Sequence, residues 1–125
     1  RVILTARAEN FMRGNPDLED TIARLQSFVR AGADVVYAPG LAAVDDIRQV
    51  VEAVEAPVNV LLLPGGPDVA ALAALGVARI SVGGAFYSAT LAAPQTAALE
   101  LKEQGTQGFW TQALEGGSVA RAAFK

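Results

Sequence analysis

The stretch AGADVVYAPG, residues 31–40, decides the fold. It joins the glycine end of a helical pattern to a short apolar run, and the run ends in a proline–glycine turn. The same order returns in LGVARISVGG, residues 75–84, two strand–helix repeats further along the chain. Short runs that are apolar on both faces are typical of parallel strands that helices cover. The stretch therefore predicts a parallel α/β fold.

Four strand-like runs alternate with helical patterns along the chain. The runs are RVILTA (residues 1–6), ADVVYA (33–38), PVNVLLL (57–63) and ARISV (78–82). Strict alternation of strands and helices implies right-handed crossovers and a parallel sheet. The spacing fits an open sheet and also half of a (β/α)8 barrel, a fold that typically needs about 250 residues. The repeated order of glycine, strand and glycine turn favours the barrel.

The clearest helical pattern follows the first strand. It is NPDLEDTIARLQSFVRAG, residues 15–32. Asn15 is the expected N-cap, Pro16 the first helical position and Gly32 the left-handed stop. Acidic residues in the first turn agree with the helix dipole.

The last third of the chain predicts helices without an intervening strand. FYSATLAAPQTAALELKEQG, residues 86–105, reads as a longer helix that Pro94 either kinks or divides. We expect residues 86–125 to form the C-terminal helices of a single partial domain over residues 1–125.

The composition indicates a globular domain and excludes several classes of function. The chain has 125 residues, of which 52% are hydrophobic and 18% charged, and a formal net charge of −3. Because no basic run occurs, we expect no binding to nucleic acid or to a membrane. Without Cys or His, the chain has no thiolate nucleophile, no imidazole base and no zinc site. The expected metal is a hard cation on oxygen ligands, namely magnesium.

Two further features concern the location and the extent of the protein. No apolar run approaches the length of a membrane span and no signal-peptide pattern opens the chain, so a cytoplasmic protein is expected. The chain begins at Arg1 directly inside a strand-like run, which predicts a piece of a longer protein.

The carboxyl ends of the strands carry the candidate ligand-binding groups, since ligands meet these ends in parallel α/β folds. Arg7, Glu9 and Asn10 follow the first strand, and the other three strands run into the turns APGL, LPGGPD and GGAF. Glycine lets backbone N–H groups approach a ligand oxygen. Arginine can hold a carboxylate by two parallel hydrogen bonds. The sequence therefore predicts an anion-binding domain.

Each of these groups also has a purely structural interpretation. Glycines can serve the turn alone, and Arg7 can form an ion pair with Glu9 or Asp34. Asn59 lies inside a strand, where it either completes a hydrogen bond of the core or contacts a ligand. A glycine pair after a late barrel strand, such as Gly83–Gly84, is a frequent phosphate cradle. A phosphate-binding barrel of another family is therefore one alternative.

Four segments in one collinear order resemble the isocitrate lyase/phosphoenolpyruvate mutase superfamily. They are LTARAEN, GNPDLEDTIARLQSFVRAGADVVYAPGL, APVNVLLLPGG and LGVARISVGGAFYSATL. The likeness runs from about Val2 to Gly108. Its most telling parts are the Ala–Arg pair at the end of the first strand and the AGAD that introduces the second strand.

The resemblance implies a (β/α)8 barrel whose last helix is commonly exchanged between the subunits of a dimer or tetramer. It also implies a magnesium-dependent lyase or mutase that cleaves or forms C–C or P–C bonds in small 2-oxo-acid or enolpyruvate-like carboxylates. Arg7 matches the residue that binds the carboxylate and the enolate oxygen, so it is the expected catalytic residue. We expect Asn59, Gly83 and Gly84 to bind the substrate together with Arg7.

The chain matches only the last four βα units of that barrel. The family's magnesium-binding aspartates and glutamate come from earlier strands, so we expect no metal ligand here and no activity from this chain alone. Where many lyases have Glu and phosphonate-handling members have His, this chain has Pro39. Pro39 cannot transfer a proton, which argues against cleavage of isocitrate or methylisocitrate. A non-catalytic anion-binding or oligomerisation half-barrel is the other alternative.

Overall fold

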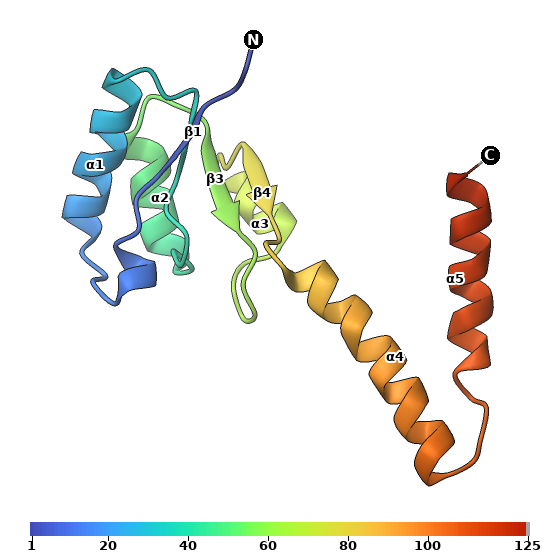
Figure 1. Ribbon diagram of the computed structural model, residues 1–125. Helices are drawn as coiled ribbons and strands as arrows, with labels where there is room; N and C mark the ends of the chain where they lie inside the picture. The colour runs from blue at the N-terminus through green and yellow to red at the C-terminus, as the bar shows by residue number, and fades with distance from the viewer. Residues whose placement is uncertain (125) are drawn as a thin grey trace. The chain divides into compact units, whose positions relative to one another are not determined.

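The computed structural model describes residues 1–124, in which strands alternate with helices (Figure 1). In chain order the elements are β1 (Thr5–Arg7), the 3-10 helix η1 (Phe11–Arg13), α1 (Leu18–Arg30), β2 (Val35–Tyr37), α2 (Val44–Ala53), β3 (Val58–Leu61), α3 (Val69–Ala74), β4 (Arg79–Ser81), α4 (Ala85–Glu103) and α5 (Trp110–Ala123). The chain divides into two compact units, the sheet unit (Arg1–Gly83) and the helical unit (Gly84–Lys125). The single partial domain over residues 1–125 stays a prediction.

The four strands form one parallel sheet in the order β1–β2–β3–β4. Strands that follow one another in the chain are thus also neighbours in the sheet, and a helix joins each pair. The predicted parallel α/β fold is confirmed. A doubly wound sheet reverses its strand order at a switch point, and these strands do not. Their order is that of successive barrel strands, whereas closure into half of a barrel stays a prediction.

The core of the sheet unit lies between the sheet and its three helices, and Figure 1 shows α1 and α2 beside the strands. Successive strand residues point to opposite faces, so each strand gives one face to this layer. The buried apolar side chains of the layer come from β2, β3 and all three helices: Val36, Val58, Val60, Leu25, Ile47, Val50 and Leu72. The opposite face of the sheet carries none of these apolar side chains.

The N-cap of α1 is Asp17, so the prediction of Asn15 is wrong. Asp17 has extended backbone angles, and its carboxylate accepts a 2.9 Å hydrogen bond from the N–H of Asp20. The carboxylate thereby satisfies a donor that helix geometry leaves without a partner. Pro16 consequently lies before the helix. Gly32 has a φ of +102° just after the helix, which confirms the predicted left-handed stop.

The described part of the helical unit consists of α4, α5 and the turn between them. α4 runs from Ala85 to Glu103 without a break at Pro94, so the alternative in which Pro94 divides this segment is wrong. Proline lacks the N–H that would bond to the carbonyl of Thr90, and the helix tolerates the loss of that one bond. Within residues 1–124, no helix is long and apolar enough to cross a membrane.

Glu100 of α4 closes the turn that leads into α5. Its carboxylate accepts hydrogen bonds from the Thr106 hydroxyl at 2.6 Å, the Gly108 N–H at 2.5 Å and the Phe109 N–H at 3.1 Å. Phe109 is the N-cap of α5 and makes no side-chain cap hydrogen bond, so Glu100 fixes the backbone just before the helix and does not cap its first turn. The Thr106 hydroxyl and then the two N–H groups hold the pKa of Glu100 below its ordinary value of 4.5.

Candidate functional site

Arg7 is the last residue of β1, and half of its side chain is exposed. Its guanidinium lies 5.2 Å from the centre of the Tyr37 ring, and its Nε donates a 2.8 Å hydrogen bond to Oε1 of Glu9. Of the two ion pairs that the sequence leaves open, the structure forms the one with Glu9, while Asp34 pairs with Arg1. The ring and the carboxylate together fix the direction of the Arg7 guanidinium.

A row of side chains starts at Arg7 and crosses the sheet on the face away from the helices. The strand register joins four residues, one from each strand: Arg7, Tyr37, Asn59 and Arg79. We call these four residues the inner row. Residues paired in register point to the same face of a sheet. Two contacts agree with this placement, because Arg7 lies over Tyr37 and Asn59 bonds to Ser81.

Asn59, in the middle of the inner row, is only 1% exposed. Its Nδ2 donates a 3.0 Å hydrogen bond to Oγ of Ser81, whereas its Oδ1 is buried and has no partner in the described part of the chain. A buried acceptor without a donor costs about 1–3 kcal/mol. Asn59 thus makes a core hydrogen bond with one half of its amide and leaves the other half unused. Its contact with a substrate stays a prediction.

The glycine turns at the strand ends adopt left-handed backbone conformations. Gly40, after β2, has a φ of +91°, and a Cβ at this position would lie 3.0 Å from the Cβ of Phe11. The loops that follow β1 and β2 therefore touch at the sheet edge where Arg7 lies. Gly83, after β4, has a φ of +53°. Gly84 belongs to the helical unit as the N-cap of α4. A ligand contact of Gly83 and Gly84 stays a prediction.

A hollow of about 340 Å³ opens beside Arg7, between the loop after β1 and α1. It is lined by Arg7, Ala8, Glu9, Asn10, Arg13, Asn15, Arg24 and Phe28. Next to it, the Asp20 carboxylate accepts 2.6 Å hydrogen bonds from Nε of Arg24 and from Nδ2 of Asn10. Arg24 and then Asn10 hold the pKa of Asp20 below its ordinary value. Two of the three arginines of the hollow, Arg7 and Arg24, are thus already paired with acids.

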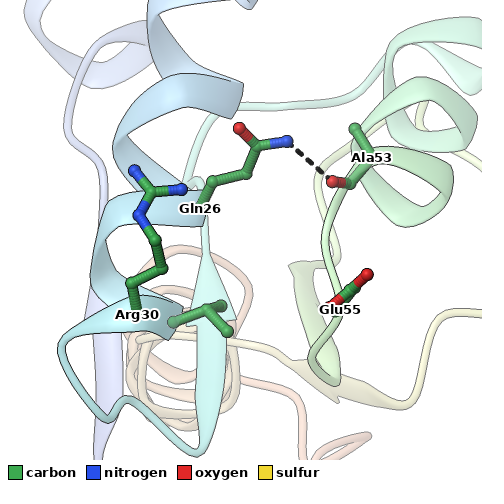
Figure 2. A pocket seen from close by; sticks show the side chains of 5 residues that line it. Gln26, Arg30, Ala53 and Glu55 are labelled. Atoms are coloured by element: carbon green, nitrogen blue, oxygen red, sulfur yellow. Dashed lines mark hydrogen bonds between the residues drawn. The ribbon is translucent and has the colours of Figure 1, made fainter.

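Another hollow, of about 300 Å³, lies where α1 and α2 end (Figure 2). Gln26 donates a 2.9 Å hydrogen bond from Nε2 to the carbonyl of Ala53, which ties the two helices together. Figure 2 shows Arg30 and Glu55 at the margins of this hollow. Each helix runs back to the start of the next strand, so the hollow lies at the amino ends of the strands. Ligands of parallel α/β folds bind at the carboxyl ends of the strands. This hollow therefore belongs to the packing between α1 and α2.

The described residues do not bring metal ligands together. Within residues 1–124, no group of three or more acidic, His or Cys side chains could hold a metal ion. Glu9 lies two residues after the end of β1, and Arg7 already engages it. The donor set of this part of the protein therefore does not fit a magnesium ion.

Comparison with known proteins relates this geometry to a family. The sequence pattern of phosphoenolpyruvate phosphomutases matches residues 1–102. The chain belongs to the phosphoenolpyruvate phosphomutase family. An uncharacterised protein of Mycobacterium tuberculosis is 39% identical to this family member over 98 residues, which are 78% of this chain and 38% of that protein.

Solved structures support the same assignment. A candidate lyase/mutase from Burkholderia cenocepacia is 47% identical with a TM-score of 0.89, covering 98% of this chain and 45% of that one. A 2,3-dimethylmalate lyase, a member of the PEP mutase/isocitrate lyase superfamily, is 26% identical with a TM-score of 0.71, covering 86% and 39%. The predicted superfamily is confirmed. This phosphomutase-family chain spans less than half the length of each of these relatives.

Three residues of the site face lie outside the predicted set, Tyr37, Arg79 and Ser81. Arg79 and Ser81 belong to the ARISV run, in which they alternate with Ile80 and Val82. The alternation is the signal that identifies them, because it sends apolar residues toward one face and polar residues toward the other. Ser81 ends β4 and accepts the hydrogen bond of Asn59, whereas Arg79 begins that strand.

Proposed function

We propose that this phosphomutase-family chain is part of a magnesium-dependent enzyme that cleaves or forms a C–C or P–C bond in a small 2-oxo-acid or enolpyruvate-like carboxylate. The observation that carries the proposal is Arg7, a half-exposed and oriented guanidinium at the carboxyl end of β1. Membership of the family supports the class of reaction.

Arg7 would bind the substrate carboxylate and stabilise the charge that grows beside it. Glu9 engages the Nε and Tyr37 lies against the guanidinium, while the two terminal amino groups make no hydrogen bond within residues 1–124. These groups suit two parallel hydrogen bonds to a carboxylate. When the bond beside the carbonyl breaks, its electrons form an enolate. A positioned donor to such an oxyanion is typically worth about 3 kcal/mol.

Pro39 restricts the chemistry that we propose for the complete enzyme. Its side chain is fully buried just after β2 and cannot give or accept a proton. By resemblance it occupies the position of a glutamate in many lyases and of a histidine in phosphonate-handling members. Proton transfer would therefore use a residue outside this position, and we propose a substrate other than isocitrate or methylisocitrate.

The rest of the site would come from protein outside these 125 residues. The chain covers 45% of the Burkholderia structure, and its consecutive strand order suits one half of a (β/α)8 barrel. Magnesium would be held by carboxylates of the other half and would act as a Lewis acid when bound. Exchange of the last helix between subunits would make the enzyme a dimer or tetramer.

Titration calorimetry with oxalate, a mimic of the pyruvate enolate, tests the role of Arg7. The complete protein is used with magnesium present. Arg7→Ala should weaken oxalate binding about 100-fold, because it removes a charged donor aimed at the ligand. The thermal midpoint should hardly change, since the exposed pair with Glu9 contributes little to stability. Arg30→Ala, at the far end of α1, is the matched control and should leave the affinity unchanged.

Three results would contradict the proposal. Equal oxalate affinity in the wild type and in Arg7→Ala would remove Arg7 from the site. Binding of a sugar phosphate that depends on Gly83 and not on Arg7 would favour a phosphate-binding barrel. A complete protein that binds neither ligand would favour the non-catalytic half-barrel.

A further inference from the structure

The inner row ends in a cation that has no counter-charge among residues 1–124. Arg79 is an exposed residue on the inner face of β4. The four ion pairs formed within the described residues all involve other arginines. Arginine stays charged at every pH at which proteins fold, so the loss of a proton cannot remove its positive charge.

Within residues 1–124, no acid pairs with Arg79 and the strand register places none on its face of the sheet. The other ionisable residues that the register places on this face are Arg7 and Tyr37. The helix α3, which leads to β4, contains only Val, Ala and Leu. Beside Arg79, on a strand roughly 4.8 Å away, Oδ1 of Asn59 is buried and has no donor within residues 1–124. Two neighbouring groups, the Arg79 guanidinium and the Asn59 amide oxygen, therefore lack partners within residues 1–124.

The place of Arg79 in its strand favours a protein partner over a substrate. Arg79 is the first residue of β4, whereas Arg7 and Ser81 are the last residues of their strands. Ligands of parallel α/β folds bind at the carboxyl ends of the strands. In a barrel the strands are tilted relative to the barrel axis. Residues paired in register therefore lie progressively farther, from β1 to β4, from the end of the barrel at which ligands bind. Arg79 would then lie below the level of the ligand.

We propose that the part of the complete protein that covers the inner face, which we call the closing wall, carries an aspartate or glutamate that pairs with Arg79. The inference rests on the proposed function in taking the sheet as one part of a closed barrel. A guanidinium covered by that wall would be costly without a carboxylate, whereas a well-bonded pair offsets much of the cost. The guanidinium has five N–H donors, enough to serve both this carboxylate and Oδ1 of Asn59. Arg79 thus links the two parts of the barrel.

Thermal unfolding of the complete protein and its Arg79→Met variant at pH 7.5 and pH 5.5 tests the pair. Methionine keeps the length and removes the charge. At pH 7.5 the midpoint should fall by about 10 °C, because a buried carboxylate is left unpaired. At pH 5.5 the difference in midpoint between the variant and the wild type should be smaller. Burial raises the pKa of the carboxyl group left without a partner, so the folded variant takes up a proton. Arg30→Met, an exposed arginine on α1, should lose little at either pH.

A second variant identifies the partner. Each acidic residue of the closing wall is changed to its amide in the Arg79→Met background. The amide variant of the true partner should restore most of the lost midpoint, because it removes the unpaired charge, and the others should not. No restoring partner would overturn the proposal.

Other outcomes of the Arg79→Met measurement also overturn it. An unchanged midpoint would mean that no carboxylate is buried against Arg79. A loss that is equal at both pH values would reduce Arg79 to a packing residue. An unchanged midpoint with weaker oxalate binding would place Arg79 in the ligand site. The unfolding measurements need no ligand, so they stay informative even where the oxalate test of Arg7 fails.

Discussion

Gly40 shows how one backbone position shapes the rim at the carboxyl ends of the strands. Its left-handed φ of +91° turns the chain after β2, and its missing side chain leaves room for Phe11 of η1. We expect Gly40→Ala to destabilise the sheet unit by about 2–3 kcal/mol. Part of this loss comes from the backbone strain and part from the contact with Phe11. Urea unfolding measures it.

Gly65→Ala separates these two contributions. Gly65 also has a positive φ, of +76°, but a Cβ there would meet no atom within 4 Å. This variant should lose only the strain, about 1 kcal/mol. Equal losses in Gly40→Ala and Gly65→Ala would show that the contact with Phe11 contributes nothing.

The residues of the candidate site differ in how far the sequence predicts them. Arg7 follows an apolar run that ends in charged residues, so its place at a strand end is readable from the sequence. Its choice of Glu9 over Asp34 is not, because both carboxylates are within reach and Arg1 takes Asp34 only in the folded chain. The inner row needs the register of four strands, and no local pattern encodes register between strands more than 20 residues apart.

Among the elements, the turn between α4 and α5 depends on one carboxylate. Glu100→Gln should loosen this turn at neutral pH, because the amide is neutral and keeps only one acceptor oxygen. Amide hydrogen exchange at Gly108 and Phe109 should accelerate in the variant. Glu103→Gln, on the same helix, is the matched control and should leave both amides unchanged. Equal protection in Glu100→Gln and the wild type would contradict the role of Glu100 in holding this turn.

The acid sensitivity of this turn follows from the direction of the pKa shift. Three hydrogen bonds, the Thr106 hydroxyl contributing most, favour the charged carboxylate of Glu100 and lower its pKa from 4.5. The stabilisation is therefore fully present above pH 4.5 and is lost as the pH falls through the lowered pKa. The exchange rates of wild type and Glu100→Gln should converge in that acidic range. A difference that persists below it would contradict this origin.

Secondary structure is predictable to the extent that its signals are local. Apolar runs followed by glycine turns predict the four strands, and Gly32 predicts the end of α1. The start of α1 is less certain from the sequence, since Asn15 and Asp17 are both good N-caps and the folded backbone selects Asp17. The continuity of α4 through Pro94 is equally ambiguous, because proline both begins and bends helices.

At the scale of the whole molecule, exposed apolar surface predicts that the 125-residue chain associates with itself. Both units expose large apolar side chains: Val2, Ile3, Leu4, Ile80, Phe86, Leu91, Trp110, Leu114 and Val119. In the sheet of residues 1–124, β1 and β4 also leave one edge unpaired each. Light scattering after size exclusion should give a mass at least twice the 12.9 kDa of one chain.

The complete protein provides the comparison for this prediction. Intact mass spectrometry first establishes how long its chain is. If it contains the wall that we propose, the edges and the inner face should be covered within one subunit, and association should depend less on concentration. A 125-residue chain that stays at 12.9 kDa and unfolds in one cooperative step would contradict the expected self-association.

The inner row has a consequence for how the sheet finds its correct pairing. β1, β2 and β4 have only three residues each, so few ladder hydrogen bonds fix their alignment. A slip of β4 by one residue would exchange Arg79 and Ile80 between the two faces. The guanidinium would then be driven into the apolar layer around Leu72, at a cost far above that of the lost hydrogen bonds. Arg79 therefore makes the misaligned sheet unfavourable and fixes the register of β4.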